Sequence, residues 1–474
     1  MNRNQLALLT PKQMAKADQI AIASGISEQS LIEEAGRAVT NAILRRFAAR
    51  PTLVLAGPGN NGADARVVFA KLKQARWPVR LIEAAEIKPD SLQNARLIVD
   101  GLFGAGLSRP ITGPMADLIQ QVNEKHLPVI AIDIPSGFDG ETGQCLSVGF
   151  QAALTVTFFR FKPGHFLHPA RAACGELELC DISIPENVLS EIPVTTYRNA
   201  PGLWSLPQKS ISAHKFDHGH ALIISGPAGK TGAARLAARA ALGAGAGLVT
   251  IAGPENVQAE LSAHLTAIMQ QRADHARDIS HLLSDRRFTA CLIGPGAELN
   301  AETRAKAAAA LESGAKIVLD AGVLRAFKGL FVQFRNLVQM RERPVILTPH
   351  EGEFSSLFNG LINKSESKTE RALEAAKLSG AIIVLKGADT IIASPDGRIA
   401  VNDNAPPFLA TAGSGDVLAG IILALLAQGM EGFVAACAGV YIHGKAAQDL
   451  GPGLNAELLS QARFRTGNAE NPLL

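Results

Sequence analysis

Short, continuous runs of apolar residues alternate with alanine-rich helical stretches along this chain, and the alternation occurs twice. The runs are apolar at successive positions, so we expect strands that are covered on both faces, which means parallel sheets with crossover helices. The pattern therefore predicts an α/β fold. The candidate strands are Thr52–Ala56, Val79–Ile82, Arg96–Asp100, Val129–Ile134 and Leu154–Phe158, then Ala221–Ser225, Ala290–Ile293, Lys316–Asp320, Val345–Thr348 and Ala381–Leu385.

The chain is long enough for two domains, since 474 residues exceed what one ordinary core holds. Between the two halves lies a stretch without helical or strand periodicity that contains Pro185, Pro193, Pro201 and Pro207. We expect domains at residues 1–190 and 208–474 with a linker at 191–207. The halves share no sequence register, so we do not predict a duplication.

Composition excludes several classes of partner. The formal charge is only +3, no long Lys/Arg run occurs and aromatic residues make up 5 %, so nucleic-acid or membrane-surface binding has no support. Five cysteines without a CxxC pair or metal-ligand spacing suit a reducing compartment. The polar start does not resemble a signal peptide, and Val417–Ala427 is shorter than the ~20 residues of a spanning helix. We expect a cytoplasmic protein with small-molecule partners.

The segment Thr411–Asp416 consists mainly of small residues and leads directly into an apolar helix, Val417–Ala427, which ends before Gly429. Small residues let several backbone amides point one way, and the helix N-terminus adds partial positive charge. Such a turn can hold a phosphate, and Asp416 beside it could take a proton from an attacking hydroxyl. A plain helix cap by Ser414 or Asp416 is the structural alternative.

Other predicted strands in this half end in small or polar residues, namely Ser225–Gly232, Gly294–Gly296, Thr348–Glu353 and Lys386–Thr390. The first is not a Walker loop, because only two residues separate Gly226 from Gly229. In open α/β sheets ligands bind outside the carboxyl ends of strands, so these segments indicate one site. His350 beside Glu353 favours function over a structural role, and Lys386 suits a phosphate or ribose contact, although it could be a surface lysine.

The glycine-rich approach to Asp416 resembles the signature of ribokinase-like enzymes. Together with His214–His220, Gly232–Ala238, Gly243–Val249 and Thr348–Glu353, it resembles the nucleotide-dependent NAD(P)H-hydrate dehydratases over roughly Leu206–Gly453. The resemblance implies a ribokinase-like three-layer α/β/α domain. It also implies a repair reaction on NADHX or NADPHX, the hydrates that form when water adds across the nicotinamide ring and leaves a hydroxyl at C6. The hydroxyl is phosphorylated from ADP (ATP in many eukaryotic relatives), after which phosphate leaves and the ring is restored.

By resemblance, Asp416 is the base and a hydrate contact, and Glu353 orients Mg²⁺ through water. The further implied hydrate contacts are Ala233, Gly296 and His350, and the implied nucleotide contacts are Lys386, Gly387, Ala388, Asp389, Thr390 and Gly415. Gly322 departs from the family, which usually has Asp there.

A hydroxymethyl kinase with a non-catalytic N-terminal binding domain is the second hypothesis, because enzymes of the wider superfamily share the catalytic aspartate that Asp416 resembles. His350 and a long helix expected over Ala233–Gly247 favour the repair enzyme.

The first half has its own strand–turn–helix, at Gly57–Asp64. It matches GxGxxG formally through Gly57, Gly59 and Gly62, but its asparagines are unusual for a redox dinucleotide fold. Oxygens of Asn61, Asp100 and Ser136 could surround a monovalent cation, and Asp133 could exchange a proton with a substrate. Each segment could also be an ordinary turn.

This set resembles the NAD(P)H-hydrate epimerase domain, a Rossmann-like three-layer fold, over roughly Leu8–Ile184. The resemblance implies interconversion of the R and S hydrates at C6, with K⁺ held by Asn61, Asp100 and Ser136 and Asp133 as the proton-transfer residue. We also expect a homo-oligomer. The implied hydrate contacts are Asn60, Asn61, Gly62, Ala63, Asp64, Gly104, Ala105, Gly106, Leu107, Ser108, Arg109, Pro110 and Asp133.

Two alanines, Ala63 and Ala65, stand where the epimerase family usually has glycine. If the backbone at residue 63 needs positive φ, alanine there costs ~1 kcal/mol or more. These alanines favour a third hypothesis, in which the first domain only senses nucleotides or binds a partner.

Overall fold

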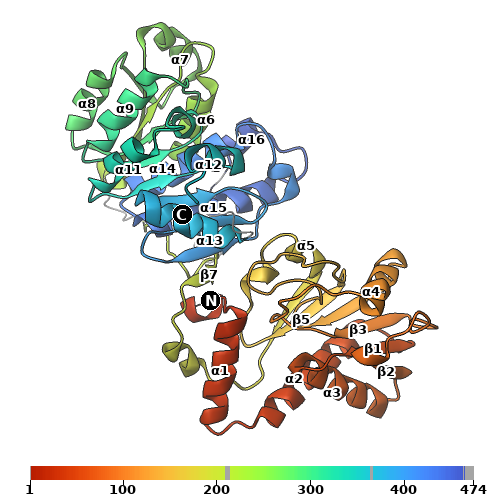
Figure 1. The fold of residues 1–474 in the computed structure, drawn as a ribbon. Helices are drawn as coiled ribbons and strands as arrows, with labels where there is room; N and C mark the ends of the chain where they lie inside the picture. The colour runs from red at the N-terminus through yellow and green to blue at the C-terminus, as the bar shows by residue number, and fades with distance from the viewer. Residues whose placement is uncertain (1, 209–213, 363–366, 463, 465–474) are drawn as a thin grey trace. The chain divides into compact units, whose positions relative to one another are not determined.

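A computed structural model describes residues 2–208, 214–362, 367–462 and 464. The chain divides into two compact units, Asn2–Arg198 and Asn199–Leu474 (Figure 1). The prediction of two α/β domains is confirmed. Asn199 and Trp204, inside the stretch that we gave as linker, belong to the second unit: Trp204 Nε1 donates to Asn199 Oδ1 at 2.9 Å, and both residues are buried.

The first unit is built on a fully parallel sheet with strand order β2-β1-β3-β4-β5-β6 (Figure 1). Its strands are β1 (Thr52–Ala56), β2 (Val79–Glu83), β3 (Leu97–Gly101), β4 (Val129–Ile132), β5 (Leu154–Phe158) and β6 (Glu176–Cys180). Its helices are α1 (Pro11–Ala23), α2 (Glu28–Arg46), α3 (Asn60–Gln74), α4 (Pro114–Glu124) and α5 (Ala170–Ala173), and β7 (Thr196–Arg198) ends the unit.

Alternate residues of the strands face two different cores, as expected for strands covered on both faces. Val54 and Val99 pack with residues of α1, α2 and α3, whereas Leu53 and Ile98 pack with residues of α4. The carboxyl ends of the parallel strands therefore converge at one edge, where the predicted epimerase segments follow β1, β3 and β4.

In the second unit the strand order runs β10-β9-β8-β11-β12-β13-β14-β15-β16, parallel as far as β14 and antiparallel from there. The strands are β8 (His220–Ile224), β9 (Leu248–Gly253), β10 (Met269–Arg272), β11 (Phe288–Ile293), β12 (Lys316–Leu319), β13 (Val345–Leu347), β14 (Ile382–Leu385), β15 (Thr390–Ala393) and β16 (Ile399–Asn402). Apart from the edge strand β10, these strands are mostly buried, and α14 and α15 pack against the sheet.

The helices of this unit are α6 (Gly232–Gly243), α7 (Gln258–His264), α8 (Ala276–Ser284), α9 (Ala301–Leu311), α10 (Gly322–Ala326), α11 (Phe331–Gln339), α12 (Glu351–Leu357), α13 (Lys368–Ser379), α14 (Ser414–Ala427), α15 (Gly432–Leu450) and α16 (Ala456–Ser460). The expected long helix to Gly247 is wrong, because α6 ends at Gly243 and β9 begins at Leu248. Gly245 has φ +99°, a left-handed conformation that turns the chain into that strand.

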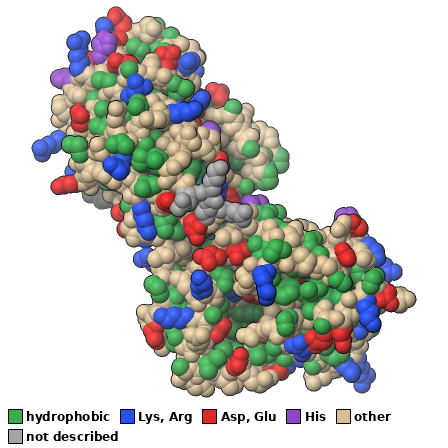
Figure 2. Space-filling view, viewed as in Figure 1, with side chains coloured by type: hydrophobic (Ala, Val, Ile, Leu, Met, Phe, Trp, Pro, Cys, Tyr) green, Lys and Arg blue, Asp and Glu red, His purple; other side chains and the backbone are tan. Residues whose placement is uncertain are grey.

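Charged residues of both signs are mixed over the face seen in Figure 2, without an extended patch of one sign. This mixture agrees with the small formal charge of +3. No helix among the described residues is long and apolar enough to cross a bilayer.

Candidate functional sites

A cavity of about 910 Å³ lies at the carboxyl ends of the strands in the first unit. Apolar residues of α1 and α2, among them Met14 and Leu31, form one wall, and the loops after β1 and β3 form another. Most of the predicted hydrate contacts line it: Asn60, Asn61, Asp64, Gly104, Ala105, Gly106, Leu107, Ser108, Arg109, Pro110 and Asp133. Gly62 and Ala63 are not among the lining residues.

Asp133 lies in this cavity directly after β4, with φ +68°. Such a conformation is sparsely populated for a residue with a side chain, and it is held here by four contacts. Lys162 Nζ donates to Asp133 Oδ1 at 2.6 Å, Thr157 Oγ1 donates to the same oxygen at 3.0 Å, and the Ala105 amide donates to Oδ2 at 2.9 Å. His165 Nε2 lies 2.7 Å from the Asp133 carbonyl oxygen, and its Nδ1 accepts from the Lys162 amide. His165 is therefore the Nε2–H tautomer.

The carboxylates of the cavity differ in how readily they hold a proton. Burial alone would raise the pKa of Asp133, but the charges of Lys162 and His165 together with the hydrogen bonds from Lys162 and the Ala105 amide lower it to about 2. Burial, followed by the charges of Asp133 and Asp18, raises the pKa of Asp64 to about 8. Burial also raises the pKa of Asp18 to about 6. At neutral pH the cavity thus contains an ionised Asp133 beside a protonated Asp64.

The glycine-rich turn before Asp64 places a helix N-terminus at the cavity. Helix α3 begins at Asn60, and the Ala63 amide donates to the Gly59 carbonyl at 3.1 Å. Neither Ala63 nor Ala65 has positive φ, because both are ordinary helical residues. The condition for backbone strain at residue 63 is therefore not met. Ala65 is fully buried, so its methyl group packs in the core.

Two of the expected K⁺ ligands, Asp100 and Ser136, are in direct contact. Asp100 Oδ1 accepts from the Ser136 hydroxyl and Oδ2 from the Ser136 amide, both at 2.7 Å, and Oδ1 also accepts from the Leu102 amide. Burial raises the pKa of this carboxyl to about 6, against those hydrogen bonds. A fully buried carboxylate whose hydrogen-bond donors are all neutral fits a monovalent cation.

In the second unit, Asp416 lies in the first turn of α14. The helix follows Gly413, whose φ of +87° makes the tight approach possible. Burial, and after it the negative charge of Asp320, raises the pKa of Asp416 to about 7 against the charge of Lys386. A carboxyl group that titrates near neutral pH at a helix N-terminus can both accept and release a proton during turnover.

Lys386 connects the carboxylates of this site. Its Nζ lies 2.9 Å from Asp320 Oδ1 and 3.8 Å from Glu353 Oε2, and a Cβ built on Gly415 would lie 3.3 Å from it. Although burial lowers the pKa of Lys386, the charges of Asp320 and Glu353 raise it overall. The structure therefore brings Lys386, Gly415 and Asp416 together, as the proposed phosphoryl-transfer site requires.

His350 is the N-cap of α12 and has a structural role there. Its Nδ1 accepts from the amides of Gly352 and Glu353, and its own amide donates to Glu353 Oε2 at 3.0 Å, which forms a capping box. Glu353 is buried and so carries its charge beside Lys386. No group of three or more His, Cys, Asp or Glu residues suited to a metal occurs in the described part of the chain.

The remaining predicted residues follow other strand ends or begin helices. Gly296 has φ +71° and lies against Gly226, and Ala233 is in the first turn of α6. Gly387 and Thr390 hydrogen-bond to each other across the turn, with Ala388 and Asp389 between them. Gly322, which departs from the family, has no room for a side chain, since its Cβ would lie 2.3 Å from the Ala297 carbonyl oxygen.

Sequence reasoning missed several residues of the two sites. Lys162 follows β5, so the strand-end argument that found Asp133 could have found it. Lys368 pairs with Asp389 at 2.7 Å, but it lies at the start of α13, where no motif marks it. His443 of α15 hydrogen-bonds to the Ser414 backbone at the start of α14, and burial lowers its pKa to about 4. Asp18 comes from α1, outside the segments that follow strand ends.

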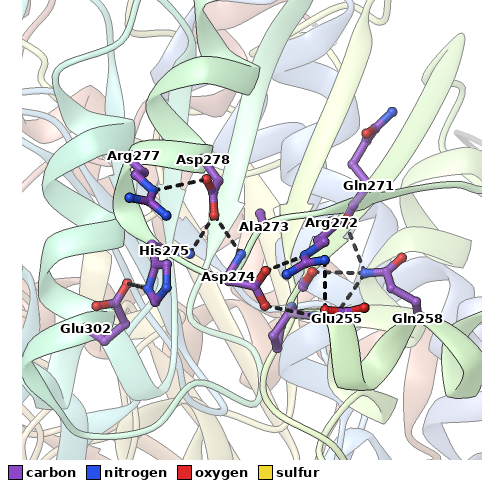
Figure 3. Close-up of polar contacts among 12 residues, drawn as sticks. Glu255, Gln258, Gln271, Arg272, Ala273, Asp274, His275, Arg277, Asp278 and Glu302 are labelled. Atoms are coloured by element: carbon purple, nitrogen blue, oxygen red, sulfur yellow. Dashed lines mark hydrogen bonds and ion pairs between the residues drawn. The ribbon is translucent and has the colours of Figure 1, made fainter.

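Another polar cluster, at the carboxyl ends of β9 and β10, serves the fold (Figure 3). Asp278 Oδ2 accepts from the amides of Asp274 and His275, both at 2.9 Å, and Asp274 Oδ1 accepts from the Glu255 amide. Arg272 pairs with Glu255 and Asp274. These carboxylates are helix and turn caps, so we assign no ligand to them.

Comparison with known proteins gives consistent matches over both units. A family model described as NAD(P)H-hydrate dehydratase matches residues 221–462, and one described as YjeF-related protein N-terminus matches residues 28–95 and 79–164. The bifunctional NAD(P)H-hydrate repair enzyme Nnr of Moorella thermoacetica is 34 % identical over 93 % of this chain and 92 % of its own length. The protein of that name from Coxiella burnetii is 33 % identical over 92 % and 93 %.

Among solved structures, the chain is similar to the ADP/ATP-dependent NAD(P)H-hydrate dehydratase of Bacillus subtilis co-crystallised with ATP and Mg²⁺. The identity is 32 %, the match covers 54 % of this chain and 91 % of that one, and the TM-score is 0.48.

Proposed function

Because the chain belongs to the family of bifunctional NAD(P)H-hydrate repair enzymes, we propose how its own residues carry out the two reactions. The enzyme combines an NAD(P)H-hydrate epimerase domain with an NAD(P)H-hydrate dehydratase domain. The epimerase supplies the S hydrate and the dehydratase converts it to NADH or NADPH. The residue roles, the metal ions and the choice of nucleotide given below are proposals.

In the dehydratase site, Asp416 accepts the proton of the C6 hydroxyl while that oxygen attacks the terminal phosphorus of the nucleotide. The observation that carries this role is the position of Asp416 in the first turn of α14 with its pKa raised to about 7. The amides at the start of α14 and the Lys386 ammonium stabilise the negative charge of the transferring phosphoryl group. Phosphate then leaves from C6, which restores the ring because phosphate is a better leaving group than hydroxide.

The remaining dehydratase residues bind and orient the two substrates. Lys386, Gly387, Ala388, Asp389, Thr390 and Gly415 contact the nucleotide, for which we propose ADP, and Ala233, Gly296 and His350 contact the hydrate. Glu353 is buried at the same strand edge, so it fits the role of orienting Mg²⁺ through water. Mg²⁺, when bound, neutralises phosphate charge.

In the epimerase cavity, the hydrate occupies the space between the start of α3 and Asp133. Asn60, Asn61 and Asp64, with Gly104 to Pro110, contact it, and Asp133 accepts the proton of the C6 hydroxyl, whereas Gly62 and Ala63 belong to the turn but do not line the cavity. Asp64, which holds a proton at neutral pH, donates it to the ring nitrogen N1. Asn61, Asp100 and Ser136 hold K⁺, and this cation, when bound, neutralises the buried charge of Asp100.

One incubation tests the assignment. The full chain receives mixed R and S hydrate, Mg²⁺ and either ADP or ATP, and NADH recovery, nucleotide products and residual hydrates are measured. We expect both hydrates to disappear, with NADH and free phosphate as products and AMP formed from ADP. A stable phosphoester of the hydrate, without recovery of NADH, would identify a kinase. Removal of K⁺ is expected to slow consumption of the R hydrate only.

Three further expectations remain proposals: preference for ADP over ATP, a homo-oligomeric state and a cytoplasmic location. All five cysteines are free thiols in the structure, which supports a reducing compartment.

A further inference from the structure

The epimerase cavity contains a buried cation for which the proposed roles above give no function. Lys162 lines the cavity, and its side chain is only 3 % exposed. The cavity has four acidic lining residues, Asp18, Glu28, Asp64 and Asp133, and two basic ones, Lys162 and Arg109, of which Arg109 is exposed. Lys162 is therefore the cation buried among these carboxylates.

The hydrogen bonds of this ammonium leave one donor for a ligand. Lys162 Nζ donates to Asp133 Oδ1 at 2.6 Å and to Thr157 Oγ1 at 2.9 Å. A lysine ammonium has three N–H donors, and these two are its hydrogen-bond partners among the described residues. The lysine backbone is also fixed, because its amide donates to His165 Nδ1 and His165 in turn contacts the Asp133 carbonyl oxygen. Lys162 and Asp133 are thus positioned as one unit.

We propose that Lys162 is a catalytic residue of the epimerase, whose third N–H binds the C6 oxygen of the hydrate and stabilises its negative charge during ring opening. This inference deepens the epimerase assignment and rests on it. The hydrate is a hemiaminal, in which C6 carries both the hydroxyl and N1. As the hydroxyl proton moves to Asp133, the C6–N1 bond breaks with its electron pair on N1, C6 becomes an aldehyde carbon and N1 takes up the Asp64 proton.

Rotation about C5–C6 then presents the other face of the aldehyde to N1. Reclosure forms the C6–N1 bond again, returns the proton from N1 to Asp64 and transfers the proton on Asp133 to the new hydroxyl. The step needs no oxidant, reductant or co-reactant, and atoms and charge balance. Because Asp133 holds a proton weakly, with a pKa of about 2, a cation on the C6 oxygen is required to make that hydroxyl acidic enough.

The test compares Lys162→Met, Lys162→Arg and the matched control Lys125→Met, an exposed lysine that follows α4. The rate of R-hydrate consumption and its KM are measured in the full chain, with the uncatalysed rate subtracted. Dehydration of the S hydrate by the same molecules is the internal measure of active protein. We expect Lys162→Met to lower the epimerase kcat by about 100-fold with KM within about threefold, as for loss of one transition-state contact.

A purely structural ion pair predicts a different result. Loss of Lys162 would then distort the Asp133 loop, raise KM and leave kcat within threefold of the wild type, and that outcome overturns the proposal. If Lys162→Met fails to fold, Lys162→Arg distinguishes the catalytic role from the structural one, because arginine keeps the positive charge but displaces the N–H donor. We expect at least a tenfold loss of kcat at an unchanged Tm, and an unchanged kcat overturns the proposal. If the wild-type chain does not consume the R hydrate at all, the epimerase assignment itself fails.

Discussion

The two sites use the same electrostatic arrangement in domains that share no sequence register. Each has a lysine paired with an aspartate that follows a parallel strand: the buried Lys162 with Asp133 at 2.6 Å, and the half-buried Lys386 with Asp320 at 2.9 Å. Each also has a second carboxyl group, on a helix that follows a glycine-rich turn, and its pKa is raised, to about 8 for Asp64 and to about 7 for Asp416. Asp64, whose pKa lies above neutral pH, suits a general acid, and Asp416, whose pKa lies near neutral pH, suits a general base.

The difference between the sites lies in which aspartate the lysine stabilises in the ionised form. In the first unit, Lys162 pairs with the aspartate that we propose as proton acceptor, and Asp64 is left protonated. In the second unit, Lys386 pairs with Asp320, and the proposed acceptor Asp416, which has no direct ion pair among the described residues, has a pKa raised to about 7. One arrangement can therefore favour proton donation or proton acceptance, depending on which group the cation touches.

The largest expected effect is that of Asp416→Asn, which removes the proposed base of the second site. We expect the S-hydrate turnover to fall by about 1000-fold while the nucleotide Kd changes less than threefold, because the amide keeps the shape but cannot accept the proton. Steady-state rates and calorimetric titration of ADP measure the two quantities. Asp449→Asn, an exposed carboxylate on α15, is the control. A variant that turns over at a comparable rate would show that Asp416 is not the base.

Asp133→Asn tests whether the two sites are separate. We expect consumption of the R hydrate to fall by about 100-fold, since the proton acceptor is lost and Lys162 loses its ion pair. Turnover of the S hydrate should remain within twofold of the wild type. Chromatography that separates the two hydrates during the reaction provides the measurement. Equal loss of both activities would contradict two independent sites.

The pH dependence of the two reactions should have opposite signs. Dehydration of the S hydrate needs ionised Asp416, so its rate should fall about tenfold per pH unit below about 7. Epimerisation needs protonated Asp64, so its rate should fall as the pH rises above about 8. Initial rates with each hydrate over a pH series measure both profiles in one preparation. If both rates changed with pH in the same direction, the assignment of Asp416 as base and Asp64 as acid would be contradicted.

The smallest effect is expected for Ala63→Gly, which restores the residue usual in the epimerase family. Since residue 63 is helical, glycine should lower the free energy of unfolding of the first unit by about 0.5–1 kcal/mol and leave the epimerase rate within twofold. Urea denaturation followed by Trp77 fluorescence, in a Trp204→Phe background, reports on that unit alone. A severalfold faster epimerase would mean that this turn must adopt a non-helical conformation during catalysis.

Much of the fold could be predicted from local patterns. Runs such as Thr52–Ala56 and Leu154–Phe158 became strands with those bounds, because strands buried on both faces have a continuous apolar sequence. The edge strands β6 and β10, which have exposed polar residues, were missed, and so were β9, β15 and β16, although these three are largely buried. The expected helix to Gly247 was wrong because alanine and glycine continue past the residue where the chain turns.

The sequence by itself determined the α/β class, the family resemblance and most residues that lie at the strand ends. These features follow from residue type and spacing along one segment, which periodicity and glycine placement record directly. Only the tertiary structure decided which charges meet: Lys162 with Asp133, Lys386 with Asp320, and Lys368 with Asp389. The physical reason is that burial and charge–charge distance, which set the pKa values of Asp64 and Asp416, arise from elements far apart in the chain.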